Sequence, residues 1–495
     1  MCGIAGAFGQ QSPRGVEKML EKIAHRGPDG HGVKKLPHGI LGHTRLAILD
    51  IEGGHQPMQG FNGTWMTFNG EIYNYRELAR KHLKGVRLRT RSDTEVVIKL
   101  YQKLGPDCVE LLDGMFAFAI LQGDELFMAR DPLGIKPLYW GERDGMFYFA
   151  SEIKSLSLVV DNIHEFPAGH WYHSKKGWCA YYELDPFPVE IKDEAQAVEA
   201  IRTTLGDAVQ KRLLGDVPVG ISLSGGLDSS IVAMLANAGA DHLHSFAVGM
   251  EGSEDIPAAR KVAEALGTQH HERIYTEEEA LEALPKVIYH LESFDPALIR
   301  SSIPNFFLAE MASQYVKVIL TGEGADEIYA GYDYLRSYHN PQRLQDEMLG
   351  ITAALHNTNL QRADRIAMAF SLEARVPFLD VKSVALGLGL PAQWKVHSGK
   401  PAKFLLRRAF SDDLPEEIVK RPKQKFSKGA GSSDLIAEIA KSEIPDVEFK
   451  AERARMFACT GYRLPNKEAL YYYRILRRYY QSQWIFPTMG QSRSL

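Results

Sequence analysis

The sequence has little that would direct it to a membrane, a nucleic acid or an oxidising compartment. Only 4 of its 495 residues are cysteine and none form a CxxC pair, so neither a disulfide framework nor a zinc site is expected. No apolar run reaches the roughly 18 residues of a spanning helix, and Met1–Gln10 lacks the pattern of a signal peptide. The formal net charge of −4 shows no strong bias of sign. These absences favour a cytoplasmic protein with neither nucleic-acid nor membrane partners.

The length of 495 residues exceeds one ordinary core, and we expect separate domains over residues 1–185 and 190–495. The first is rich in short apolar segments separated by Gly, Asn and Asp, which is typical of an antiparallel β domain. We expect strands at Gly3–Phe8, Thr64–Phe68, Met115–Leu121, Glu125–Ala129 and Met146–Ala150, and helices at Gly15–Ala24 and Asp93–Leu104.

A Pro-rich link, Leu184–Pro188, marks the boundary, and the periodicity changes after it. Alternating helices and strands follow, which predicts a parallel sheet covered on both faces. The expected helices are Glu194–Leu214, Ser230–Ala238 and Pro257–Leu266, and the expected strands are Val217–Leu223, His244–Val248 and Val316–Leu320. From about Ile351 the pattern is mostly helical.

Cys2 lies directly behind the initiator methionine. If Met1 is removed, Cys2 carries a thiol and a free α-amine, whose pKa near about 7.7–8.0 leaves much of it neutral. A neutral amine beside the thiol can serve as its base, as in an N-terminal nucleophile. Taken alone, Cys2 is more simply explained as a small buried residue.

The segments that accompany Cys2 favour the catalytic interpretation. After Met1–Gly6 come, in order, His25–Gly30, Gly42–Ile48, Phe68–Asn74, Ser92–Glu95, Leu112–Ala117, Ala129–Gly134 and Ala150–Glu152. This series resembles the glutaminase domain of class II glutamine amidotransferases over essentially the whole first domain. The resemblance implies an αββα sandwich of the N-terminal nucleophile type.

Glutamine hydrolysis is acyl transfer from an amide, which requires a nucleophile, oxyanion donors and clamps for a zwitterion. The resemblance assigns Cys2 as nucleophile, and the Asn69 side chain and Gly70 N–H as oxyanion donors, each worth roughly 3–4 kcal/mol. It implies that Arg45 binds the glutamine α-carboxylate through its planar fork. Asn69, Glu71 and Asp93 complete the glutamine site. Without that context, Glu71 would be a surface acid and Asp93 a helix cap.

A second site is indicated where the strand Val217–Leu223 runs into Ser224–Ser230. Glycines permit a tight turn, and serine hydroxyls with helix N-terminal N–H groups bind anions. The segment lacks the lysine of the G-x-x-x-x-G-K-[ST] loop. It resembles instead the SGGxDS loop of ATP pyrophosphatases, which cleave ATP to AMP and pyrophosphate.

Thr321–Glu327 forms an acidic loop after another strand, at the edge where ligands bind in open α/β sheets. Asp228 and Asp326 are candidate Mg²⁺ ligands, because that ion prefers hard oxygen donors. The loop resembles S-G-E-G-x-D-E, with Thr321 in place of serine, and the resemblance implies that Glu323 takes a proton from attacking ammonia. One of these acids could instead only fix the loop.

Ser371–Asp380 and Arg421–Gly429 also match this second family. Lys420–Lys428 alone is typical of a solvated basic face, but the resemblance places Lys423 on phosphates, with Lys425 as a near neighbour. The residues expected to bind ATP are Leu223, Ser224, Gly225, Gly226, Asp228, Ser229, Val248, Gly322 and Lys423.

Glu292–Ser302 resembles a segment of glutamine-hydrolysing asparagine synthetases, E-T-Y-D-x-T-T-x-R-A-S. Arg300 is retained and could bind the acceptor carboxylate, whereas Ala297 and Leu298 replace the threonines. The resemblance implies a ligase that hydrolyses glutamine, adenylates aspartate with ATP and Mg²⁺, and passes ammonia through an internal tunnel to form asparagine. A homodimer is also expected.

Three alternatives remain. The same chemistry could amidate another carboxylate, in a cell-wall precursor or natural product, as Ala297 and Leu298 suggest. A β-lactam-forming relative without glutaminase activity is disfavoured because the expected glutaminase residues are all present: Cys2, Arg45, Asn69, Glu71 and Asp93. A binding or regulatory protein with inactive sites is disfavoured because the acidic and phosphate-binding residues are all present. An enzyme that modifies tRNA is disfavoured because the sequence has no clustered basic stripe.

Overall fold

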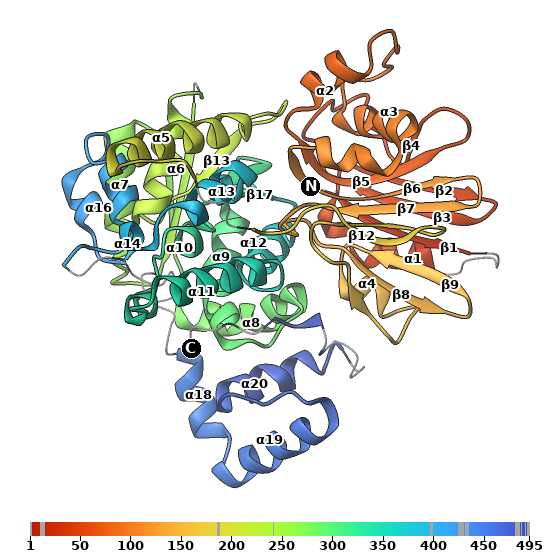
Figure 1. The fold of residues 1–495 in the computed structure, drawn as a ribbon. Coiled ribbons are helices and arrows are strands. Elements are labelled where there is room, and N and C mark those ends of the chain that lie inside the picture. The colour runs from red at the N-terminus through yellow and green to blue at the C-terminus, as the bar shows by residue number, and fades with distance from the viewer. Residues whose placement is uncertain are drawn as a thin grey trace.

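The structure is a computed structural model that describes residues 2–9, 15–185, 189–240, 242–396, 399–423, 430, 435–480, 486, 488–490 and 492. Met1, the linker residues Pro186–Pro188, and Lys425 with the end of the basic run lie outside these ranges. The predicted boundary between residues 185 and 190 therefore stays a prediction. Figure 1 shows a β-rich half beside an α/β half, with helices near the C-terminus below the latter.

The N-terminal half is a sandwich of two antiparallel six-stranded sheets. One sheet has the order β10 (His164–Glu165), β8 (Tyr139–Arg143), β9 (Met146–Ala150), β1 (Gly3–Phe8), β3 (Gly39–Arg45) and β2 (Gly30–Leu36). The other has the order β12 (Gly177–Ala180), β11 (His170–His173), β7 (Glu125–Arg130), β6 (Gly114–Gln122), β5 (Trp65–Ile72) and β4 (Met58–Gln59).

Apolar side chains of both sheets form one buried layer between them, which includes Ile4, Leu41, Ala119 and Phe149. Helices α1 (Val16–Lys22) and α4 (Ile153–Leu156) pack on the outer face of the first sheet. Helix α3 (Asp93–Leu104) and α2 (Tyr75–His82) pack on the second. The half is thus an αββα sandwich, which confirms the predicted fold; we call it the N-terminal sandwich.

The remaining chain, here the C-terminal α/β part, is built on a parallel sheet. Its order is β15 (Gln269–Ile274), β14 (His244–Gly249), β13 (Val219–Ser222), β16 (Val318–Leu320) and β17 (Glu373–Arg375). Helices α5 (Glu194–Lys211), α6 (Leu227–Asn237) and α7 (Asp255–Leu266) cover one face. Helices α9 (Pro296–Ala312) and α12 (Asn359–Met368) cover the other, with α8 (Glu277–Leu291) and α20 (Lys467–Leu476) packed outside them.

Helices α10 (Ala325–Ile328) and α11 (Pro341–Ala353) follow β16. The chain after about Ile351 is mostly helical, as predicted, and includes α13 (Val381–Gly389), α14 (Ala392–Lys395), α15 (Phe404–Ala409), α16 (Glu416–Lys420), α18 (Leu435–Glu443) and α19 (Asp446–Thr460). Strand β17 interrupts this region and was not predicted. Helix α6 begins at Leu227, three residues before the predicted Ser230, because the glycine loop leads directly into it.

Buried charges join the two halves. The Arg26 guanidinium lies 2.7 Å from Glu152 in its own half and 2.8 Å from Asp364 in the other. Glu292, at the end of α8, accepts hydrogen bonds from the backbone N–H groups of Ile153 and Lys154 at 3.0 and 2.7 Å. Because removing one partner of a buried pair is strongly destabilising, these contacts hold the halves in one relative placement.

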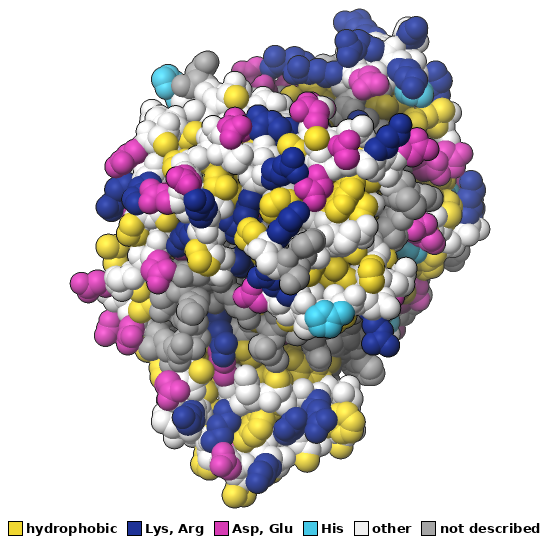
Figure 2. All heavy atoms as spheres, turned by 60° about the vertical axis from the view of Figure 1, so that its left-hand side comes forward, with side chains coloured by type: hydrophobic (Ala, Val, Ile, Leu, Met, Phe, Trp, Pro, Cys, Tyr) yellow, Lys and Arg dark blue, Asp and Glu magenta, His cyan; other side chains and the backbone are white. Residues whose placement is uncertain are grey.

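Basic and acidic side chains are interspersed on the face that Figure 2 shows, which brings the C-terminal α/β part forward. Within the described ranges, no helix has the length and apolar content needed to cross a bilayer.

Candidate active sites

Cys2 lies at the start of β1, and its backbone nitrogen donates a hydrogen bond to Oδ1 of Asn69 at 3.0 Å. Asn69 belongs to β5 in the opposite sheet, so this contact brings the two sheets together at the nucleophile. Cys2 is 8% exposed, and burial raises the pKa of its thiol. The thiol therefore requires a nearby base before it can attack an amide.

Of the two predicted oxyanion donors, Asn69 contacts Cys2 and Gly70 is the next residue of β5. Asn69 is buried, and its Nδ2 has no hydrogen-bond partner among the described residues. Such an N–H group is rare unless a ligand or water completes it. At Gly70, φ is +155° and an added Cβ would lie 2.1 Å from the Met115 carbonyl oxygen, so only glycine fits. Cys2 and its neighbours thus provide a nucleophile with a free amide donor beside it.

Arg45 ends β3, and backbone carbonyls position its guanidinium. Nη1 donates to the Ile51 carbonyl at 2.8 Å and Nη2 to the Asp50 carbonyl at 2.7 Å. Arg45 is 6% exposed. A buried guanidinium that the backbone already holds in position is well placed to bind a carboxylate ligand.

Glu71 and Asp93 form a pair of buried acids. Asp93 is the first residue of α3, directly after the N-cap Ser92, and accepts hydrogen bonds from the N–H groups of Ile72 and Thr94 at 2.9 and 2.7 Å. Burial raises the pKa of the Asp93 carboxyl to about 6. Burial and the charge of Asp93 raise the pKa of Glu71 well above its usual range. Two incompletely compensated acids attract a cation.

Strand β17 forms the wall between this site and the other half. Leu372 and Ala374 line the pocket of the C-terminal α/β part. The alternate residue Arg375 points the other way, and its Nη2 lies 3.8 Å from Oε1 of Glu71. Alternation along a strand sends successive side chains to opposite faces, so one short strand contributes to both sites.

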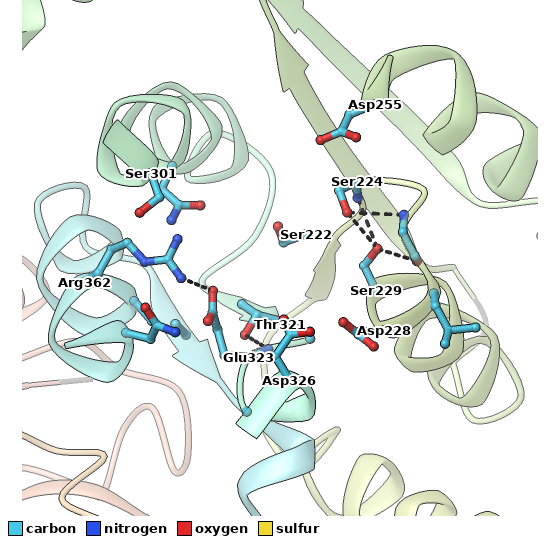
Figure 3. A pocket seen from close by; sticks show the side chains of 18 of the residues that line it. Ser222, Ser224, Asp228, Ser229, Asp255, Ser301, Thr321, Glu323, Asp326 and Arg362 are labelled. Carbon is cyan, nitrogen blue, oxygen red and sulfur yellow. Dashed lines mark hydrogen bonds and ion pairs between the residues drawn. The ribbon is translucent and has the colours of Figure 1, made fainter. Parts of the chain in front are cut away.

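The second site is a pocket of 260 Å³ around the Ser224–Ser230 loop (Figure 3). The Ser229 hydroxyl accepts from the Ser224 N–H at 3.2 Å and donates to the Gly226 carbonyl at 3.1 Å. At Gly225, φ is +66° and an added Cβ would lie 2.4 Å from the backbone of Ala258. The loop is therefore fixed by its own hydroxyls and requires glycine where it approaches α7.

Most of the predicted ATP residues line this pocket: Ser224, Gly226, Asp228, Ser229, Gly322 and Lys423. Leu223 and Val248 instead belong to the cores on opposite faces of the sheet. Side-chain contact with a ligand would require them to leave these cores, so any role they have in binding would use their backbone groups.

Two lysines neutralise the acids of the pocket. Nζ of Lys403 lies 2.5 Å from a carboxylate oxygen of Asp228 and 2.5 Å from one of Asp326. Nζ of Lys423 lies 2.5 Å from the other Asp326 oxygen. Burial alone would raise the pKa of Asp326, but these ammonium groups hold it well below its usual range. In Figure 3 Asp228 and Asp326 lie close together in the pocket.

Lys403 and Arg362 line the pocket but were not predicted. Arg362 lies on α12, where its Nη2 is 2.5 Å from Glu323, the predicted proton acceptor. The spacing of Asn359, Arg362, Ala363, Ile366 and Ala367, all of which line the pocket, marks one helical face and could have indicated Arg362. Lys403 follows a turn and has no such sequence signal.

Arg300 does not line this pocket. Its Nε donates to Oε1 of Glu468 on α20 at 2.8 Å. Near the start of α9, the pocket is lined instead by Ala297, Leu298 and Ser301, and α12 contributes Arg362. Binding an acceptor through Arg300 would require it to leave Glu468, so its role stays a prediction.

Comparisons with known proteins agree on both halves. The family described as "Glutamine amidotransferase domain" matches residues 1–168, and "Asparagine synthase" matches residues 200–354 and 337–483. Asparagine synthetase B [glutamine-hydrolyzing] of Escherichia coli (strain K12) is 38% identical over 504 residues, which cover 96% of this chain and 90% of that protein. Asparagine synthetase [glutamine-hydrolyzing] 1 of Arabidopsis thaliana is 39% identical, with 96% and 86% covered.

Proposed function

The chain belongs to the glutamine-hydrolysing asparagine synthetase family, and from this premise we propose how its residues make asparagine from glutamine, ATP and aspartate. The observation that carries the proposal is the presence of two chemically distinct sites on either side of β17. The first suits a zwitterionic amide, and the second suits a polyanion.

In the N-terminal sandwich, glutamine binds with its α-carboxylate on Arg45 and its α-ammonium between Glu71 and Asp93. Once Met1 is removed, the Cys2 nitrogen is an α-amine that takes the thiol proton, and Sγ attacks the side-chain amide. Nδ2 of Asn69 and the Gly70 N–H stabilise the oxyanion. Ammonia leaves, and water hydrolyses the thioester to glutamate.

In the pocket, the triphosphate binds along the Ser224–Ser230 loop. The β-carboxylate of aspartate attacks the α-phosphorus, pyrophosphate leaves, and Lys423 and Lys403 stabilise the negative charge that develops. Ammonia then attacks the acyl carbon of the aspartyl adenylate. Glu323 accepts a proton from the incoming ammonia, and AMP leaves.

The residues fit Mg²⁺, which usually uses one or two carboxylates together with substrate phosphates. Oδ1 of Asp228 is buried without a hydrogen-bond partner among the described residues, and Asp326 faces the same pocket. We propose that these two acids hold the ion. Bound there, it would neutralise phosphate charge. Lys403 would then exchange part of its contact with the acids for contact with phosphates.

An apolar end of the pocket supports the predicted ammonia route. Leu308 and Ala309 of α9, Ile366 and Ala367 of α12, and Ala374 of β17 line it, and Glu71 of the other site lies across β17. Ammonia in bulk water is mostly protonated and not nucleophilic, so a sheltered apolar path preserves its reactivity.

The test supplies glutamine, ATP, Mg²⁺ and aspartate and measures glutamate, AMP and asparagine together. We expect asparagine and AMP in equal amounts. Glutamate without aspartate-dependent AMP would contradict aspartate as acceptor and favour another carboxylate, for which Ala297 and Leu298 leave an apolar wall. A homodimer and a cytoplasmic location stay predictions.

A further inference from the structure

Ser492, near the C-terminus, lies at the end of the pocket that the first turns of α9 line. Ser492 lines the pocket together with Ala297 and Leu298 of α9. Its backbone N–H donates to Oδ2 of Asp295 at 3.0 Å, and its hydroxyl donates to Oδ1 at 2.9 Å. The C-terminal tail is therefore bound by a two-point contact to one buried carboxylate.

The same carboxylate organises the pocket wall. Asp295 is the N-cap of α9, where it accepts the Leu298 N–H at 3.0 Å, and it is 5% exposed. An N-cap contributes about 1 kcal/mol to its helix. Docking of Ser492 is thus connected, through one side chain, to the helical turn that carries Ala297 and Leu298.

Two other residues near the C-terminus pack on this part of the protein. Phe486 packs against Phe294 and Tyr473, with ring centroids 5.9 and 5.8 Å apart. Gly490 lies against the residue two before α12, since an added Cβ would be 2.2 Å from the Asn357 carbonyl oxygen. Gly490 and Ser492 thus lie beside the starts of α12 and α9, the two helices whose inner faces line the pocket.

Ser492 supplies a polar group that α9 lacks at this point. Ala297 and Leu298 have no polar side-chain atoms, and the Ser301 hydroxyl donates to the Ala297 carbonyl at 2.9 Å. The Ser492 hydroxyl uses its proton on Asp295, which leaves its lone pairs able to accept a hydrogen bond. The adjacent Asp295 carboxylate adds negative potential.

We propose that Ser492 is an acceptor-recognition residue that binds the α-ammonium of the amino acid being amidated. This inference rests on the proposed function, because it assigns acceptor binding to the end of that pocket where α9 begins. The tail thereby supplies the hydroxyl that the apolar residues Ala297 and Leu298 do not.

The test compares Ser492→Ala with Ser442→Ala, which changes an exposed serine whose hydroxyl donates to the Ile439 carbonyl in α18. Losing a hydrogen bond to a charged group predicts an increase of about tenfold in the aspartate KM of Ser492→Ala. We expect little change in kcat or in glutamine hydrolysis, and partial rescue in Ser492→Thr. Ser442→Ala should match the wild type.

A chain that ends at Met489, and therefore lacks Ser492, gives a second test. Its aspartate KM should rise at least as much as that of Ser492→Ala, while glutamine hydrolysis stays near wild type. An unchanged aspartate KM in both variants would overturn the inference.

A wild type that forms no AMP with aspartate would contradict the proposed function instead. In that case amide hydrogen exchange at Leu298–Ser301 reports the tail directly. Faster exchange in the shortened chain supports docking of the tail on α9, and identical exchange overturns it.

Discussion

Each of the two sites contains a pair of acids, but the two pairs have opposite electrostatics. In the N-terminal sandwich, burial raises the pKa of Asp93 to about 6, and burial with Asp93 raises that of Glu71. In the pocket, Lys403 and Lys423 overcome burial and lower the pKa of Asp326. The charge of the first pair is incompletely compensated by the described residues, whereas Lys403 and Lys423 already compensate the charge of the second pair.

This difference corresponds to the charge of each ligand. A site for the α-ammonium of an amino acid contains acids whose negative charge is compensated only when the ligand binds. A site for a triphosphate keeps lysines, and these pair with the acids until phosphates arrive. The balance of charge in an unliganded site thus indicates the sign of its ligand.

Among changes to the acid pairs and their neighbours, the largest effect we expect comes from removing one acid of the second pair. Asp228→Ala deletes a proposed Mg²⁺ ligand and leaves Lys403 with one carboxylate partner fewer. AMP formation should fall roughly a thousandfold, while glutamine hydrolysis, measured as glutamate in the same samples, should stay near wild type. Equal loss of both activities in a folded variant would contradict separate sites.

A smaller effect is expected at the oxyanion donor. Asn69→Ala removes the free Nδ2 and also the acceptor that holds the Cys2 nitrogen. We expect kcat for glutamine hydrolysis to fall about a hundredfold. Synthesis supplied with ammonium chloride should remain, which serves as the control for folding.

The smallest expected effect is that of pH, and it distinguishes the two pairs. An acid with a raised pKa is protonated below that value and then no longer attracts an ammonium group. As pH falls through 6, the glutamine KM should therefore increase, approaching about tenfold per unit. Asp326 has a lowered pKa and stays ionised, so the KM for ATP in ammonia-driven synthesis should change little. Parallel changes in both constants would contradict the assignment.

The sequence predicted elements well where local signals and burial agree. Strand β9 (Met146–Ala150) and helix α3 (Asp93–Leu104) have the predicted bounds, because an apolar run and a serine N-cap mark them. Strand β17 was missed because its charged residues, Glu373 and Arg375, are buried against the other half. Their burial depends on tertiary contacts that composition cannot reveal.

The candidate sites show the same limit. Residues inside continuous motifs come together in the structure: Asn69 contacts Cys2, and Ser229 and Asp326 line one pocket. Lys403 reaches the acids from a turn far along the chain, and no local pattern predicts that contact. Arg300 illustrates the converse, because its retained position in a motif did not reveal its pairing with Glu468 on α20.

The central claim is that two separate sites communicate by ammonia alone, and Cys2→Ala tests it most directly. The variant should lose glutamine-driven asparagine formation by roughly a thousandfold or more. With ammonium chloride it should form asparagine and AMP in equal amounts at the wild-type rate. Loss of ammonia-driven synthesis in a folded variant would contradict the claim, because the thiol would then be required on both sides of β17.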